Sequence, residues 1–222
     1  MRGPALAIPL HIEADGPDSL LMCLTRTAHN YALAQWAGNE PNLHSFPPDY
    51  HRLQVERFLW DHRADLVGKD VLDIGVLIRR EWVGPYYHTL GPMDCDITAD
   101  VQDMPLASGT VDAVICTEVL EHVPDPMQAM REIHRVLKLG GVFLGAAPFF
   151  WPWHGCQDYQ DYWRITHQGW RLLTRAFAET TIAETKWTDE ALPLLDLIRR
   201  FEGWGWETGV TAATGYCVRS VK

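Results

Sequence analysis

Three features that the sequence lacks each argue against a class of protein. No run of apolar residues approaches the length of about 20 that a membrane-spanning helix needs. The five cysteines form no CxxC pair and are odd in number, which is typical of reduced thiols rather than of a disulfide framework. Basic residues are few, since the chain has 19 lysines and arginines but 29 aspartates and glutamates. Because binding to phosphate backbones or anionic lipids needs a basic surface, we expect a small-molecule partner, no nucleic acid and no membrane.

The composition is otherwise that of a folded protein. The chain has 222 residues, of which 47% are hydrophobic and 22% charged, and this suits one main domain with a buried core. Two prolines interrupt the short apolar patch at the start, and acidic residues follow it, so no secretory signal is expected. We therefore expect a cytoplasmic protein. Its oligomeric state cannot be predicted from these features.

The first part of the chain differs in character from the rest. Residues 1–49 are predicted to form an N-terminal cap segment, with a strand over 5–12 and a helix over 20–36. A Pro-Pro pair marks the end of this segment. Apolar residues at helical spacing then predict an amphipathic helix over 50–65. We expect the main domain to cover 50–222.

After residue 68, short apolar runs alternate with helical stretches, the pattern of an α/β protein with a mostly parallel sheet. A helix is predicted over 126–137, because Pro126 suits a first turn and apolar residues recur on one face. The pair Gly140 and Gly141 is expected to end it. Strands are predicted over seven runs: 71–74, 87–90, 97–99, 111–116, 142–147, 181–187 and 215–221.

Five motifs follow one another in the middle of the chain. They are KDVLDIG at 69–75, DITADVQDMP at 96–105, VDAVICTEVLEHVPDP at 111–126, REIHRVLKLGG at 131–141 and APFFWPWHGCQDYQDYWRIT at 147–166. In this order and spacing they resemble the class I S-adenosylmethionine-dependent methyltransferases, in particular the type 11-like branch with EVLEH and HG...DYWR segments. The resemblance implies a Rossmann-like α/β fold, a seven-stranded mostly parallel sheet with helices on both faces and an antiparallel last strand. It also implies S-adenosyl-L-methionine as the cofactor, bound at the carboxyl ends of the first strands.

The resemblance assigns a set of residues to the cofactor: Asp73, Gly75, Asp100, Val101, Cys116 and Glu118. The glycine loop that begins with Asp73 and Gly75 is degenerate, because VLIRREW fills positions 76–82, where the family has further glycines. Side chains there would crowd the methionine end of the cofactor, since glycine permits close backbone approach. Asp100 stands where the family accepts a hydrogen bond from the adenine amino group. The structural alternatives are a helix cap for Asp73, an ordinary tight turn for Gly75 and a solvated loop acid for Asp100.

The second strand also departs from the family at its end. The family has an acid there that accepts hydrogen bonds from both ribose hydroxyls, and Gly91 stands in its place. Asp94 or Asp96 could replace it only if the loop after the strand bends back.

Candidate groups for the chemistry lie in the EVLEH and DYWR segments. Methyl transfer from a sulfonium needs an aligned acceptor and in many cases the removal of its proton. The candidate bases are His122, His154 and Asp161, although any one of the ten histidines is more often structural. Arg164 either serves the acceptor side or pairs with Asp158 or Asp161 to fix the loop.

Tryptophan is abundant, with ten in the chain and seven of these after residue 150. Trp151 and Trp153 directly follow a predicted strand. They either pack against other hydrophobic residues or stack on a flat substrate or a sulfonium. Trp163 and Trp170 are expected to pack within a small lid.

A metal site is predicted from the spacing of Glu118, Glu121 and His122, which share one face if a helix begins there. Together with His154 they offer oxygen and nitrogen ligands for Mg, Mn or a similar divalent ion. The resemblance extends to small-RNA 2'-O-methyltransferases and to O-methyltransferases of ubiquinone biosynthesis, in which an ExxEH cluster holds a metal that binds acceptor hydroxyls. The alternative is that Glu118 lines the cofactor and His122 is packed or hydrogen-bonded.

The sequence thus predicts an S-adenosylmethionine-dependent methyltransferase that acts on an oxygen or nitrogen of a small molecule. The alternative is a methyltransferase-fold protein that has lost cofactor binding and acts as a partner subunit or catalyses a non-methylating reaction. A nicotinamide enzyme is disfavoured, because no GxGxxG follows the first strand.

Overall fold

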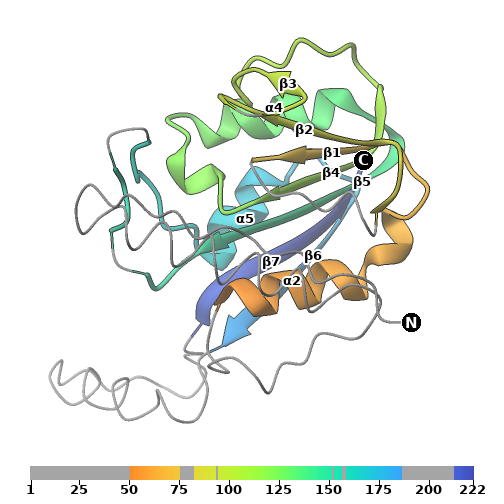
Figure 1. The fold of residues 1–222 in the computed structure, drawn as a ribbon. Helices are drawn as coiled ribbons and strands as arrows, with labels where there is room; N and C mark the ends of the chain where they lie inside the picture. Colours follow the sequence, from red (N-terminus) through yellow and green to blue (C-terminus); the bar gives the residue numbers. More distant parts are fainter. Residues whose placement is uncertain (1–50, 76–82, 94, 152, 157–158, 187–212) are drawn as a thin grey trace, which may run out of the picture. The chain divides into compact units, whose positions relative to one another are not determined.

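One mixed sheet organises the described part of the chain. The computed structural model describes residues 51–75, 83–93, 95–151, 153–156, 159–186 and 213–222. Seven strands lie within these residues: β1 Val71–Ile74, β2 Tyr87–Gly91, β3 Ile97–Thr98, β4 Val111–Thr117, β5 Leu137–Pro148, β6 Glu179–Lys186 and β7 Ala213–Val221. Their order is β3-β2-β1-β4-β5-β7-β6 (Figure 1). β7 is antiparallel to β5 and β6, whereas the pairs from β3 to β5 are parallel. This is the predicted class I methyltransferase fold.

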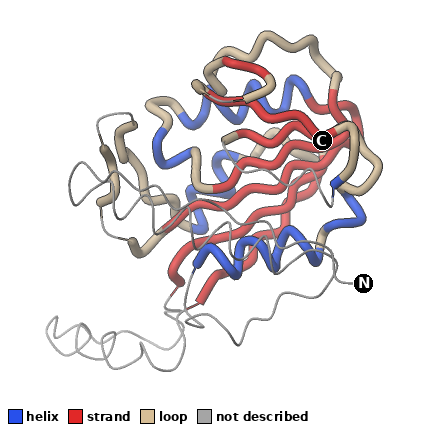
Figure 2. The backbone as a smooth tube through the Cα atoms, viewed as in Figure 1, coloured by secondary structure: helices blue, strands red, loops and turns tan. Residues whose placement is uncertain are grey.

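Helices cover both faces of this sheet, which explains why its central strands are apolar throughout (Figure 2). Helix α2, His51–Asp61, contacts β5, β6 and β7, and α4, Pro126–Val136, contacts β5 and the third helix α5, His167–Leu173. Successive residues of β4 therefore enter different cores: Val114 packs with the α4 side, and Ile115 packs with the α2 side. The predicted coverage of both faces is confirmed.

Helix α4 shows how local sequence sets an element that positions the site. Its N-cap is Asp125, whose side chain accepts a hydrogen bond of 2.9 Å from the backbone N–H of Gln128. Pro126 occupies the first turn, as predicted. The helix buries four side chains against the sheet: Ala129, Met130, Ile133 and Val136.

The boundary between α4 and β5 differs from the prediction. The helix ends at Val136, and β5 already begins at Leu137, so the strand passes through the two glycines that were expected only to separate the elements. Leu137 pairs with Val111, and the register shifts before Ala113 pairs with Val142. A side chain at Gly141 would meet the Lys138 carbonyl oxygen at 2.8 Å, which explains why glycine is needed at this irregularity.

The helix predicted over 50–65 is shorter and divided. α2 ends at Asp61, and a separate 3-10 turn, η2 Arg63–Asp65, follows it. Val55 and Leu59 are fully buried, as the helical spacing indicated. The strand and helix predicted before residue 50, the loop 76–82 and the end of the strand predicted to Trp187 lie outside the described residues. Among the helices that the structure describes, none is long and apolar enough to cross a membrane.

Candidate functional site

The carboxyl end of β4 carries the first part of the site. Glu118 follows β4 with a backbone φ of 57°, a left-handed conformation that is uncommon for a residue other than glycine. Its N–H donates to the Ala146 carbonyl at 3.0 Å, which ties this turn to β5. A 3-10 turn, η3 Leu120–His122, begins only afterwards. The prediction that Glu118, Glu121 and His122 share one helical face is therefore wrong, because Glu118 has a left-handed backbone and lies outside the helical turn.

Glu118 is held by a residue that carried no motif in the sequence. The Oε1 atom of Glu118 lies 2.9 Å from Nε2 of His51, the first residue of α2. The Nδ1 atom of His51 lies 2.8 Å from the Thr185 hydroxyl on β6. These contacts join residues 67 and 134 positions apart, a separation at which only the assembled sheet brings them together.

Three residues of the predicted metal site do come together. The Oε1 atom of Glu121 lies 3.7 Å from Nε2 of His122 and 4.0 Å from Nε2 of His154. Their potential ligand atoms all lie within 4.8 Å of one another, and Glu118 is not a member of this group. The Glu121 side chain is fully buried, and the two histidines are partly buried. The predicted four-residue set is thus reduced to three.

Both histidine rings of this cluster have a defined orientation. The Nδ1 atom of His122 lies 2.6 Å from the Gln160 carbonyl oxygen, so Nδ1 must donate. The Nδ1 atom of His154 lies 3.2 Å from Oδ2 of Asp161. In each ring the outer nitrogen is engaged, and Nε2 is directed to Glu121. Burial lowers the pKa of His122 despite the raising effect of the Gln160 carbonyl, which favours its neutral form.

Asp161 is held by charge-assisted hydrogen bonds. Arg164 donates from Nη1 to Oδ1 at 2.5 Å and from Nη2 to Oδ2 at 2.7 Å, and the His154 backbone N–H donates at 2.8 Å. The hydrogen bonds from Arg164 lower the pKa of Asp161 to about 2. A carboxylate with this pKa is a poor base near neutral pH, so the geometry favours a positioning role over the predicted role as a base. Arg164 takes the predicted alternative of fixing the loop.

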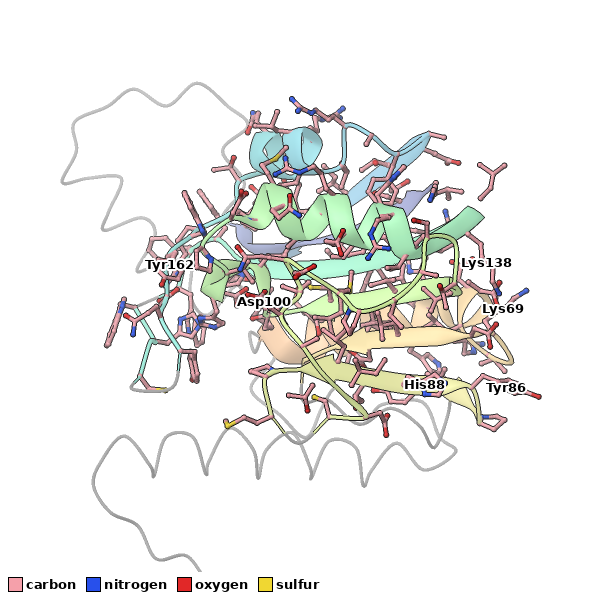
Figure 3. All side chains as sticks on the ribbon, turned by 90° about the horizontal axis from the view of Figure 1, so that it is seen from above. Lys69, Tyr86, His88, Asp100, Lys138 and Tyr162 are labelled. Atoms are coloured by element: carbon pink, nitrogen blue, oxygen red, sulfur yellow. The ribbon has the colours of Figure 1, made fainter. Side chains whose placement is uncertain are left out.

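The segment that carries His154 is anchored directly on Glu121. The backbone N–H groups of Tyr162 and Trp163 both donate to the Glu121 carbonyl oxygen, at 2.7 and 3.1 Å. Figure 3 places Tyr162 toward the same end of the sheet as Asp100, whereas Lys69 and Lys138 lie at the other end. The acceptor-side segment and the predicted adenine loop therefore share the carboxyl edge of the sheet, as open α/β sheets require for ligand binding.

The aromatic residues of this segment divide into two groups. Trp170 is fully buried, but it packs in the main core and not in the small lid that was expected. Trp163 is 44% exposed, although its indole N–H donates to the Val123 carbonyl at 2.8 Å, so it is not packed as fully as expected. Trp151 and Trp153 are 39% and 70% exposed, which leaves their ring surfaces available for stacking.

On the cofactor side, Asp73 and Gly75 lie at the end of β1 and just after it. The Asp73 carboxylate is fully buried and accepts a 2.6 Å hydrogen bond from the Tyr87 hydroxyl. Gly75 has a φ of 112°, and its N–H donates to the Leu90 carbonyl at 2.8 Å. The family reading of Gly75 as the first glycine of a tight turn fits this conformation. Asp73 faces a tyrosine within the sheet rather than solvent.

The other predicted cofactor residues lie along the same edge. Asp100 is exposed, and its Oδ1 accepts from the Gln102 backbone N–H at 2.8 Å, which shapes the loop. The side chains of Val101 and Cys116 are buried in the core, so a cofactor contact there falls to the backbone. Burial and nearby carboxylates raise the pKa of the Cys116 thiol, which keeps it protonated and unreactive.

The predicted ribose position has no carboxylate at Gly91 itself. A Cβ built there would lie 2.9 Å from the Cys95 sulfur, so the cysteine occupies the adjacent space. Asp96 does bend back to β2, where Thr89 donates from its backbone N–H at 2.9 Å and from its hydroxyl at 3.2 Å to Oδ2. Asp94 lies outside the described residues.

Comparisons with known proteins show a likeness to methyltransferases. Residues 87–145 match the model of a family described as a methyltransferase domain. The chain is 33% identical to the ubiquinone biosynthesis O-methyltransferase of Pseudomonas aeruginosa (strain UCBPP-PA14), over 42% of this chain and 51% of that protein. It is 41% identical to 2-methyl-6-phytyl-1,4-hydroquinone methyltransferase 1, chloroplastic, of Oryza sativa subsp. japonica, over 25% of this chain and 18% of that protein. The chain thus spans about half the length of the first of these relatives and less of the second.

Solved structures support the fold at low sequence identity. A SAM-dependent methyltransferase from Archaeoglobus fulgidus superposes with a TM-score of 0.53 at 14% identity, covering 78% of this chain and 94% of that one. The 1,6-didemethyltoxoflavin-N1-methyltransferase of Burkholderia thailandensis gives a TM-score of 0.53 at 14% identity, covering 96% and 93%. The described residues therefore have the class I methyltransferase fold.

Proposed function

We propose that this chain is an S-adenosylmethionine-dependent methyltransferase that methylates an oxygen or nitrogen of a small molecule. The observation that carries the proposal is the cluster of Glu121, His122 and His154, which lies at the carboxyl edge of the sheet, just after the end of β4. This is the edge at which a class I methyltransferase fold holds its ligands. The family match over 87–145 and the named activities of the relatives support the same reaction class.

The proposed chemistry is a displacement at the methyl carbon. S-adenosylmethionine supplies an activated methyl group on a sulfonium, and the acceptor atom forms the new bond to carbon as the sulfur–carbon bond breaks. The acceptor must also lose its proton. If no metal is bound, we assign the Nε2 atom of His122 to receive that proton, because burial lowers the pKa of this imidazole and favours its neutral form, in which Nδ1 carries the proton. Asp161 positions His154 through Nδ1.

We further propose that Glu121, His122 and His154 hold a divalent ion such as Mn or Mg. The donor set fits, because one carboxylate and two imidazoles with engaged outer nitrogens are ligands for such ions. A metal there would bind acceptor hydroxyls and lower their pKa. With a metal bound, both Nε2 atoms would serve as ligands, and the acceptor proton would leave to solvent. Glu118 is not proposed as a ligand, because His51 holds it outside the group.

The acceptor we propose is a flat ring with adjacent hydroxyls, such as a catechol. Two hydroxyls suit a metal held by only three protein ligands, and the exposed faces of Trp151 and Trp153 offer stacking surfaces. The names of the relatives, which refer to ubiquinone biosynthesis and to a hydroquinone, are consistent with this class. We place the reaction in the cytoplasm.

The cofactor side favours a second candidate, a methyltransferase fold that no longer binds the cofactor. Two observations support it: the buried Asp73 carboxylate accepts a hydrogen bond from the Tyr87 hydroxyl, and position 91 holds a glycine in place of the family's acid. Such a protein would serve as a partner subunit or catalyse a reaction without methyl transfer.

Titration calorimetry with S-adenosylmethionine and S-adenosylhomocysteine separates the two candidates. The methyltransferase proposal expects binding of both in the micromolar range, and methyl transfer to catechol that EDTA suppresses. No binding of either ligand at millimolar concentration would exclude this activity and leave the second candidate. Binding with EDTA-insensitive transfer would keep the methyltransferase and remove only the metal.

A further inference from the structure

A buried chain of polar side chains links helix α2 to the carboxyl end of β4. His51 is 4% exposed and lies between the Glu118 carboxylate, at 2.9 Å, and the Thr185 hydroxyl, at 2.8 Å. The Thr185 hydroxyl in turn lies 2.8 Å from the Thr214 hydroxyl on β7. The chain of hydrogen bonds thus links His51 to three other segments, the end of β4, β6 and β7, and Glu118 is the member at the functional edge.

The direction of these hydrogen bonds follows from what each group can do. An ionised carboxylate only accepts, so the Nε2 atom of His51 donates to Glu118. In the neutral ring Nδ1 then accepts, and the Thr185 hydroxyl is its donor. That hydroxyl can accept in turn from Thr214. The Glu118 carboxylate thus selects the tautomer of His51 that points an N–H at it, and the two threonine hydroxyls can satisfy Nδ1 of that tautomer.

The position of the ring is also fixed by packing. A Cβ built on Gly215 would lie 2.4 Å from Cε1 of His51 and 2.7 Å from the Ala147 carbonyl oxygen. The imidazole therefore lies directly against the backbone of β7, where no larger residue fits. Since His51, Thr185 and Thr214 are all buried, this imidazole cannot reach an acceptor as a base. Its effect on a ligand must act through Glu118.

Glu118 itself has the features of a functional residue. A left-handed backbone is unfavourable at a residue other than glycine, and such residues cluster at ligand sites. Its side chain is 16% exposed, so it is not fully enclosed by the protein. The next residue, Val119, lies beside Gly75, since a Cβ on that glycine would meet its Cγ2 at 3.2 Å. Glu118 thus stands close to Gly75, the residue directly after β1.

We propose that His51 is a positioning residue that aims the Glu118 carboxylate at the ammonium group of the cofactor's methionine part. The inference rests on the proposed function, because it needs S-adenosylmethionine at the carboxyl edge of the sheet. A negative carboxylate beside the turn after β1 complements that ammonium, and a charged hydrogen bond of this kind is stronger than a neutral one. It supplies charge on the side of the site where Asp73 is buried against Tyr87.

Two variants of one residue test the role of each ring nitrogen. His51→Gln keeps an N–H at the place of Nε2, and His51→Asn keeps a polar atom only at the place of Nδ1. Calorimetry uses S-adenosylmethionine, S-adenosylhomocysteine and 5'-methylthioadenosine, which lacks the amino-acid part. We expect His51→Asn to weaken the first two ligands about tenfold, the equivalent of roughly 1.4 kcal/mol, and to leave the third unchanged. His51→Gln should stay within about twofold of wild type.

Controls separate this role from a structural one. His62→Asn changes another histidine of the same flank, whose Nδ1 contacts the Phe58 carbonyl, and should alter no affinity. Thermal unfolding monitors the fold of each variant. If His51→Asn does not fold, Thr185→Val removes only the hydroxyl that fixes Nδ1, and a loss for the same two ligands is expected from it.

The outcomes distinguish this inference from the proposed function. No binding of either amino-acid ligand by wild type would overturn both. If wild type binds these ligands, three results would overturn the inference alone. The first is a folded His51→Asn, or Thr185→Val in its place, that binds all three ligands as wild type does. The second is an equal loss of affinity for 5'-methylthioadenosine, and the third is a loss in His51→Gln as large as that in His51→Asn. A loss confined to S-adenosylmethionine would place Glu118 at the sulfonium and equally reject the ammonium contact.

Discussion

The acceptor side and the cofactor side of the site differ in how much of the family pattern they keep. On the acceptor side, His122, His154 and Asp161 each have an oriented hydrogen-bond partner around the buried Glu121. On the cofactor side, the family acids are replaced or internally bonded, as at Gly91 and Asp73. The acceptor side is therefore preorganised by its own residues, whereas the proposed cofactor side would need contacts that the family motif does not describe.

Removing the central carboxylate of the acceptor side should have the largest effect. Glu121→Gln keeps the volume of the buried side chain but replaces a charged ligand by a neutral amide. We expect Mn²⁺ affinity, measured by electron paramagnetic resonance, and methyl transfer to catechol both to fall by at least about 100-fold. The affinity for S-adenosylhomocysteine should stay within about threefold, because this change leaves the cofactor side intact.

A matched control uses the exposed Glu179 at the start of β6. Glu179→Gln removes the same charge and should alter neither Mn²⁺ affinity nor transfer. If Glu121→Gln binds Mn²⁺ as wild type does, the cluster is not a metal centre. The acceptor side would then differ from the cofactor side only in how its side chains pack.

The next effect concerns the salt bridge that fixes the acceptor loop. The pKa of Asp161 in the folded protein is about 2, below its ordinary value of 3.8, so its ionised form stabilises the fold above pH 4. Asp161→Asn should therefore lower the free energy of unfolding at pH 7 by roughly 2 kcal/mol. The deficit should shrink as the pH falls from about 4 toward 2, where the wild-type carboxylate is protonated.

Urea unfolding at pH 7 and pH 3 measures this difference. Asp103→Asn, at an exposed loop acid, serves as the control and should change stability by less than about 0.5 kcal/mol at either pH. A deficit for Asp161→Asn that is the same at both pH values would show that lost packing, not the ionised pair with Arg164, stabilises the loop.

Most of the fold could be predicted from the sequence because it follows from local patterns. β1 has the bounds that its apolar run indicated, and α4 has the predicted proline start and buried face. The boundary at β5 was missed, since glycines that end helices in other proteins lie within a strand irregularity here. Pairing with β4 decides whether these glycines end a helix or lie within a strand, and the local sequence does not indicate that pairing.

The site was predictable only where a motif marks it. Glu121, His122 and His154 were identified as one cluster and lie together. The placement of Glu118 in the same cluster failed, because one left-handed residue turns the chain before η3. His51 was missed since its contacts with Glu118 and Thr185 exist only across the assembled sheet.

The smallest predicted effect tests whether the cofactor side is incomplete at the ribose. Gly91 lacks a positive φ, so a side chain there is compatible with its backbone, but a Cβ would lie 2.9 Å from the Cys95 sulfur. The double variant Gly91→Asp with Cys95→Ala removes this clash and restores a carboxylate at the end of β2. Two ribose hydroxyls could then donate to it.

We expect this double variant to raise the affinity for S-adenosylmethionine, S-adenosylhomocysteine and 5'-methylthioadenosine about tenfold each, because all three share the ribose and hydrogen bonds to a charged group are worth about 1.5–3 kcal/mol. Calorimetry gives the three constants under one buffer condition. Gly91→Asn with Cys95→Ala has the same shape without the charge and should gain much less, and Cys95→Ala alone should gain nothing. An equal gain for the Asp and Asn variants would attribute the effect to filled space. No gain for either would mean that another acid, such as Asp96 where it bends back to Thr89, already accepts from the ribose, and the cofactor side would then be as complete as the acceptor side.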